Sequence, residues 1–85
     1  MDIKEIYDII ERVDKTTPGP WKSFIEGRDH TSGSSFIRTS GDDIELSGAT
    51  TNDQDFIAAA RQDVPALIGE IIRLRKILDD NNIPY

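Results

Sequence analysis

The sequence contains no cysteine and a single histidine, His30. Disulfide bonds and thiolate metal sites are therefore excluded, and one chain cannot assemble a metal site from several histidines. A chain without cysteine is compatible with a reducing cytosol. No apolar stretch approaches the roughly 20 residues that a membrane-spanning helix needs, so we expect no association with a membrane.

Net positive charge is also missing. Sixteen acidic residues outnumber ten basic ones, which gives the chain a net charge of −6. Because polyanions are bound through lysine and arginine, this balance argues against polymeric nucleic acid as a partner. The segment from Lys15 to Arg38 is an exception, since its basic residues exceed its two acidic ones, Glu26 and Asp29. This segment favours a site for a small anion, although a solvated surface of mixed charge is the commoner outcome.

Motifs that carry catalysis are absent as well. The sequence has no Gly-x-Ser-x-Gly turn around a nucleophile, no Walker-type phosphate loop and no dinucleotide-binding glycine pattern. The pairs Asp42–Asp43 and Asp29–His30 are candidates for acid–base chemistry, but both fall in segments expected to be turns or loops. We therefore predict that the protein is not an enzyme, and we expect no cofactor and no metal.

The most regular feature present is an apolar repeat within residues 52–79. Apolar residues recur at alternating spacings of three and four, which places them along one face of a helix as a seam. The seam consists of Ile57, Ala60, Val64, Leu67, Ile71, Leu74 and Leu78, and Ile68 and Ile72 widen it. The pattern predicts one long helix over residues 52–79, followed by a polar tail over residues 80–85.

This seam predicts self-association. The chain has 85 residues, enough for one domain (1–85), and a chain of that length buries only about two-thirds of its unfolded surface. Since cross-links are excluded, pairing with further copies is the remaining way to bury more surface. We expect a homo-oligomer, a dimer or a tetramer, formed through Val64, Leu67, Ile68, Ile71, Leu74 and Leu78.

Pro65 removes a backbone hydrogen bond from this helix, but the apolar seam continues past it. Proline cannot donate to the carbonyl of Arg61 and crowds it, so a kink or a break is expected. Because the seam continues in register across Pro65, we predict a kink. Thr51 or Asn52 is expected to cap the helix, with Gln54 three residues after Thr51.

The remaining elements predict an α+β fold. Residues 1–15 are expected to form an amphipathic helix that starts at Asp2, with Glu5 completing a capping box. Residues 21–50 are expected to form a three-stranded antiparallel meander, with strands over residues 21–26, 34–39 and 43–47. One face of the meander is then covered by the helices.

Between the first helix and the meander, the segment Thr16–Trp21 forms a stiff corner. Pro18 and Pro20 restrict the backbone on either side of Gly19, and they fix where the indole of Trp21 points. Two interpretations of Trp21 remain open, a ring that closes one end of the core and a ring that stacks on a ligand. Arg61 is similarly open, because its guanidinium suits a phosphate or a salt bridge to Asp63, to Asp53 or to a neighbouring chain.

Together these residue types favour an aromatic, anionic ligand such as a nucleotide. An indole stacks on a base, while guanidinium groups and loop amides bind phosphate. The candidate ligand-binding residues are Trp21, Arg28, His30, Ser34, Ser35, Arg38, Asn52, Phe56 and Arg61.

Two segments resemble a group of small phage and prophage proteins. They are TTPGPW at residues 16–21 and NDQDFIAAARQDVPALIGEIIRLR at residues 52–75, whereas the part between Trp21 and Thr50 departs from the group. The group is also similar to viral sponge proteins, which bind immune nucleotide signals of bacteria without cleaving them. The resemblance implies a phage protein in the cytoplasm of the infected bacterial host that sequesters a cyclic dinucleotide, a cyclic trinucleotide or a cyclic ADP-ribose derivative. The alternative is a phage protein that inhibits or modulates a host protein by binding it directly.

Overall fold

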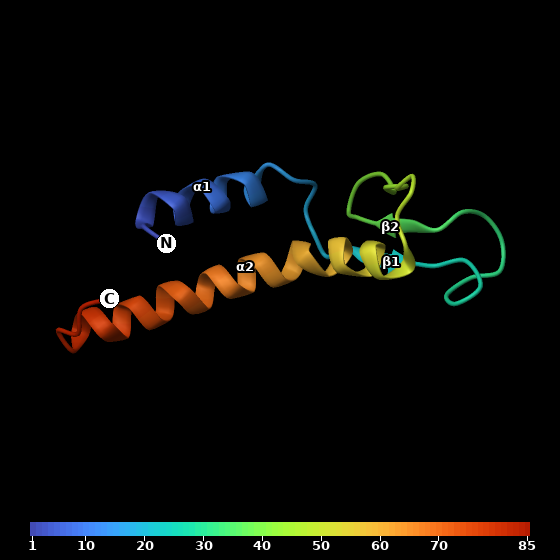
Figure 1. Ribbon diagram of the computed structural model, residues 1–85. Coiled ribbons are helices and arrows are strands. Elements are labelled where there is room, and N and C mark those ends of the chain that lie inside the picture. The colour runs from blue at the N-terminus through green and yellow to red at the C-terminus, as the bar shows by residue number, and fades with distance from the viewer.

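The computed structural model describes all 85 residues and confirms an α+β fold. Its elements are helix α1 (Ile3–Asp14), strand β1 (Lys22–Phe24), strand β2 (Phe36–Arg38) and helix α2 (Thr51–Asp80). Helix α2 runs along most of the molecule, which measures 57 × 22 × 21 Å, and the loop between β1 and β2 extends beyond its N-terminal end (Figure 1). The two strands lie beside the N-terminal end of α2, whereas α1 lies along the rest of it (Figure 1).

Helix α1 begins where the sequence predicts. The Asp2 carboxylate accepts a hydrogen bond from the backbone N–H of Glu5 at 2.8 Å, and the Glu5 carboxylate accepts one from the N–H of Asp2 at 3.3 Å. This capping box satisfies amide groups that a helix start otherwise leaves without partners. Ile6 on the same helix is completely buried, so α1 packs its apolar face against the rest of the molecule.

Helix α2 begins one residue earlier than predicted and continues without a break. Thr50 is the capping residue, and it exchanges hydrogen bonds with Asp53 at 3.0 and 3.1 Å. The predicted caps Thr51 and Asn52 are thus wrong by one or two residues. Pro65 lies inside the helix, which runs as one ribbon on both sides of it (Figure 1), so the alternative of a break at Pro65 is also wrong.

The predicted three-stranded meander is a two-stranded sheet. Strands β1 and β2 pair antiparallel, with Ser23 opposite Ile37 at the centre. The expected third strand is reduced to one bridge, in which Ile44 exchanges two backbone hydrogen bonds with Ile37 at 2.8 and 2.9 Å. Ile44 and Leu46 are half-buried between exposed residues, so the alternation that predicted a strand reflects burial without continued backbone pairing.

The core is small. Seven side chains are buried: Ile6, Ile25, Ile37, Thr39, Gln54, Ala58 and Ile68. They lie in two groups, one between the sheet and the start of α2, and the other between α1 and the middle of α2. Neither helix has the combination of length and apolar character that crossing a bilayer requires.

Candidate functional site

The corner between α1 and β1 is fixed to α2 by a glutamine. Gln62 accepts a hydrogen bond from the backbone N–H of Trp21 at 2.6 Å, and its amide donates to the carbonyl oxygen of Trp21 at 3.1 Å. The indole Nε1 donates to the carbonyl of Thr17 at 2.9 Å. Gly19 allows this close approach, because a Cβ there would lie 3.2 Å from Gln62 Oε1. The position of the Trp21 ring is therefore determined by backbone and ring contacts together.

A hollow of about 290 Å³ opens beside this corner, and we call it the corner pocket. Residues from α1, the corner and α2 meet there, so the pocket depends on the packing of both helices. Its lining consists of Ile9, Arg12, Val13, Thr16, Trp21, Ile57, Ala60, Arg61 and Val64. Trp21 and Arg61, two of the predicted ligand-binding residues, are thus brought together, and Trp21 is half-buried.

The charge of the corner pocket comes from two arginines without acidic partners. Arg12 forms no salt bridge, and Arg61 donates only through Nε, to the carbonyl of Thr17 at 3.3 Å. The salt bridge to Asp63 or Asp53 considered for Arg61 is not formed. Two guanidinium groups therefore face a largely apolar pocket with their terminal N–H groups unengaged, although the protein as a whole is acidic.

Arg28, by contrast, is committed to a structural ion pair. It donates to both oxygens of the Asp55 carboxylate, at 2.7 and 3.0 Å, and also to Asp29. The hydrogen bonds with Asp55 and Asp29 raise the pKa of the Arg28 guanidinium further above its usual value. The same contacts lower the pKa of both carboxyl groups. Arg28 thus joins the loop after β1 to the start of α2 and does not present a free cation.

Two other hairpin residues of the predicted site, His30 and Ser35, also contact their neighbours. His30 Nδ1 lies 2.7 Å from the carbonyl of Ser32, and its ring lies 5.6 Å from the ring of Phe36. The hydroxyl of Ser35 accepts a hydrogen bond from the N–H of Glu26 at 3.1 Å, whereas Ser34 is exposed.

Arg38 lies on the outer face of the sheet. Its guanidinium is 4.7 Å from the centre of the Phe24 ring, which stacks on Phe36 at 5.1 Å. Asn52 and Phe56 are exposed on α2, and the Phe56 side chain is 72% accessible. Phe56 borders a separate hollow of about 330 Å³ with Leu46, Ser47, Gly48, Ala49, Asp53 and Ile57.

The predicted site is therefore divided. Trp21 and Arg61 share the corner pocket, whereas the hairpin residues and the pair Asn52 and Phe56 lie outside it. Arg12 was not predicted, because it lies before the basic segment from Lys15 to Arg38. Its position in the last turn of α1, directly before the corner, is the signal in the sequence that could have identified it.

The predicted oligomer residues differ in how far the single chain buries them. Ile68 is buried against α1 and is not accessible to a second chain. Val64, Ile71 and Leu78 are half-buried, and Leu67 and Leu74 are exposed by 61% and 45%. The seam thus lies on the flank of the α1–α2 contact, not at its centre.

Comparison of the chain with protein-family models, with curated proteins and with solved structures returns no match. No group of three or more His, Cys, Asp or Glu side chains is arranged to hold a metal ion.

Proposed function

We propose that the protein binds and sequesters a small anionic ligand with an aromatic ring, a cyclic nucleotide, in the corner pocket without cleaving it. The observation that carries this proposal is the presence of two guanidinium groups without acidic partners, Arg12 and Arg61, beside the ring of Trp21. Arginine binds phosphate through paired N–H groups, and stacking of a base on an aromatic side chain contributes about 1–3 kcal/mol.

The size of the pocket limits what it holds. Ligand pockets generally measure about 300–1,000 Å³, so the corner pocket, at about 290 Å³, suits one nucleoside phosphate unit. The rest of a cyclic dinucleotide or trinucleotide would extend along the surface. A cyclic ADP-ribose derivative carries its base and phosphates in a compact ring, and it is the third ligand class that we consider.

The lining of the pocket supports binding without catalysis. Hydrolysis of a phosphodiester needs a positioned base, a nucleophile or a metal ion. The pocket has no carboxylate, histidine or lysine, and the one hydroxyl in it, that of Thr16, donates to the carbonyl of Val13 at 2.7 Å. Sequestration requires only affinity, which the residues present are suited to provide.

The resemblance to phage proteins supplies the context of the proposal. In the cytoplasm of an infected bacterium, a protein that binds an immune nucleotide signal lowers its free concentration below that needed by the host effector. The effect depends on the amount of the protein and on its dissociation constant, so a small chain made in quantity suits the task.

Calorimetry and thermal shift against cyclic dinucleotides, cyclic trinucleotides and cyclic ADP-ribose isomers test the proposal. A ligand of the native state raises the melting temperature in proportion to the logarithm of its concentration. Arg12→Ala and Arg61→Ala should each weaken binding by about 10- to 100-fold, since a charged hydrogen bond contributes about 1.5–3 kcal/mol. Arg38→Ala, outside the pocket, is the matched control. The proposal is refuted if no member of the panel binds, or if both pocket variants bind as the wild type does.

A second candidate function, direct binding to a host protein, is favoured by one observation. Phe56 exposes 72% of its side chain beside another hollow, and large exposed aromatic residues mark interfaces. The acidic surface suits a basic partner, in the manner of a nucleic-acid mimic. Affinity capture from host lysate with wild type and Phe56→Ser distinguishes the candidates. A stoichiometric partner that the variant loses supports this second function, whereas recovery of no partner counts against it.

A further inference from the structure

The single chain exposes more surface than its mass accounts for. A globular protein of 9.5 kDa has an accessible surface of about 5,000 Å², whereas this chain exposes 6189 Å². The excess is about 1,100 Å². Each partner in a stable protein complex buries about 800 Å², so the excess is large enough to supply one complete interface.

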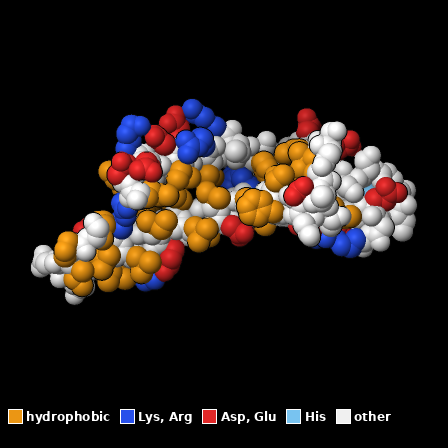
Figure 2. All heavy atoms as spheres, in the orientation of Figure 1, with side chains coloured by type: hydrophobic (Ala, Val, Ile, Leu, Met, Phe, Trp, Pro, Cys, Tyr) orange, Lys and Arg blue, Asp and Glu red, His pale blue; other side chains and the backbone are white.

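Part of this surface is an apolar groove along the flank of α1 and α2. Two hollows lie in it. The corner pocket contains the seam positions Ile57, Ala60 and Val64, and a hollow of about 550 Å³ near the termini contains Ile71, Leu74 and Leu78. Leu67 lies between them on the seam with 61% of its side chain exposed. We call this surface the seam groove, and Figure 2 shows hydrophobic side chains gathered in a band along α2, below the charged side chains of α1.

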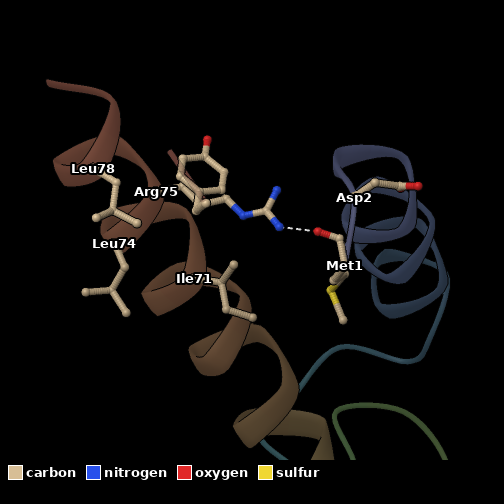
Figure 3. A pocket seen from close by; sticks show the side chains of 7 residues that line it. Met1, Asp2, Ile71, Leu74, Arg75 and Leu78 are labelled. Atoms are coloured by element: carbon tan, nitrogen blue, oxygen red, sulfur yellow. Dashed lines mark hydrogen bonds between the residues drawn. The ribbon is translucent and has the colours of Figure 1, made fainter. Parts of the chain in front are cut away.

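The end of the seam groove near the termini is built by a contact between the two helices. Arg75 extends from α2 and donates to the carbonyl oxygen of Met1, just before α1 (Figure 3). The centre of the Tyr85 ring lies 5.1 Å from the Arg75 guanidinium. Ile71, Leu74 and Leu78 are left along the open side of this contact (Figure 3).

We infer that a second copy of this chain docks in the seam groove, with the two α2 seams face to face about a two-fold axis. Every seam position from Ile57 to Leu78 is apolar. Two copies of the seam therefore pack on each other without burying a charge, as a symmetric interface requires. Asp63 and Glu70 flank it on one side and Arg61 and Arg75 on the other, the arrangement of charges found around paired helices. No other segment of the chain covers the groove, since α1 packs on the neighbouring face of α2.

Measurement of mass tests this inference directly. Light scattering or sedimentation equilibrium should give twice the monomer mass of 9.5 kDa. Leu67→Glu and Leu74→Glu place a carboxylate in the interface twice per dimer and should weaken association by roughly 100-fold or more. Ala66→Glu is the matched control, because Ala66 is exposed one residue away from the seam, and it should leave the dimer intact. A wild type that stays monomeric at roughly 1 mM, where even weak complexes form, overturns the inference.

Cross-linking locates the interface independently. The protein has no cysteine, so single-cysteine variants report one position each. Leu67 lies at the middle of the seam, where it meets its own copy whether the two helices run parallel or antiparallel. Leu67→Cys should therefore be joined into a dimer by a short bifunctional maleimide, and Ala66→Cys should not. Equal cross-linking of both variants would contradict the proposed face.

The corner pocket is part of the seam groove, so a docked second copy covers Ile57, Ala60 and Val64 of the proposed ligand site. Both experiments therefore use the protein without ligand, and circular dichroism of each variant checks that α1 and α2 remain folded. Because they read mass and proximity, their failure leaves the proposed ligand untouched. A failure of the ligand panel likewise leaves the dimer intact.

Discussion

Gln54 holds the sheet to α2 from inside the core. Its side chain is 4% exposed, and Nε2 lies 2.9 Å from Ser23 Oγ, 3.0 Å from the Phe36 carbonyl and 3.2 Å from the Phe24 carbonyl. One amide group thus contacts both strands. The sequence placed this residue in the helix cap, because Gln54 follows Thr51 by three positions, and its role as a core donor depends on where β1 and β2 lie in space.

Replacing Gln54 by leucine is expected to lower the free energy of unfolding by about 1–3 kcal/mol. The variant keeps the volume approximately but leaves buried carbonyl groups without this donor, and an unmade buried hydrogen bond costs that amount. Urea denaturation measures the change. Asn52→Ala, at an exposed position in the first turn of the same helix, should alter stability by less than about 0.5 kcal/mol. Equal stability of the Gln54→Leu protein would show that packing compensates for the lost amide.

The ion pair of Arg28 makes the stability of the hairpin loop depend on pH. Hydrogen bonds from Arg28, joined by one from the Ile25 backbone, lower the pKa of Asp29 below its usual 3.8, and Arg28 lowers the pKa of Asp55 in the same way. A carboxyl group with a lowered pKa in the folded state stabilises the fold above its unfolded pKa and loses that contribution as the pH falls.

The wild type should therefore be more stable than Arg28→Ala at about pH 7, and this advantage should shrink as the pH falls toward about 2. Thermal melts of both proteins across this range measure it. Both carboxylates are partly exposed, so we expect a modest difference that added salt reduces further. If the difference in stability between the wild type and Arg28→Ala stays constant with pH, Arg28 acts through packing and not through its ion pair.

At the scale of elements, both helices and the places of the first two strands were predictable, whereas the strand lengths and the third strand were not. The start of α1 follows from Asp2 and Glu5 because a capping box involves neighbours only. The start of α2 was missed by one residue, because Thr50 and Thr51 both fit the cap pattern. Strand pairing depends on distant residues, so the alternation around Ile44 could not reveal that only one residue there pairs with β2.

Pro65 is the residue of α2 that opposes helix formation, and Pro65→Ala should stabilise the protein by about 1 kcal/mol or more. The substitution restores an N–H donor and removes the contact of the ring with the preceding turn. Chemical denaturation checks this, with Gly69→Ala as the comparison. Gly69 is exposed and has no neighbour near its missing Cβ, so its gain, about 0.5–1 kcal/mol, reflects helix propensity alone. A loss of stability for Pro65→Ala would mean that the ring's packing near Ile10 and Val13 outweighs its cost.

At the scale of the whole molecule, the candidate site could be predicted only in part. Trp21 and Arg61 were expected to lie together because the stiff corner and the long helix are both marked in the sequence. The hairpin residues were assigned to the same site because they are close in the chain, yet the sheet lies at one end of an elongated molecule. The distance between the hairpin and the corner pocket depends on the length of α2 and on where α1 packs along it.

That elongation also affects how the protein migrates through a gel-filtration column. The radius of gyration is 16.9 Å, whereas a compact domain of this length has a value of about 12 Å. An extended particle experiences more friction than a sphere of the same mass and elutes earlier. A column calibrated with spherical standards would therefore report too many subunits for this chain, and even a monomer would be taken for an assembly. The number of subunits therefore has to come from a method that measures molecular mass independently of molecular shape.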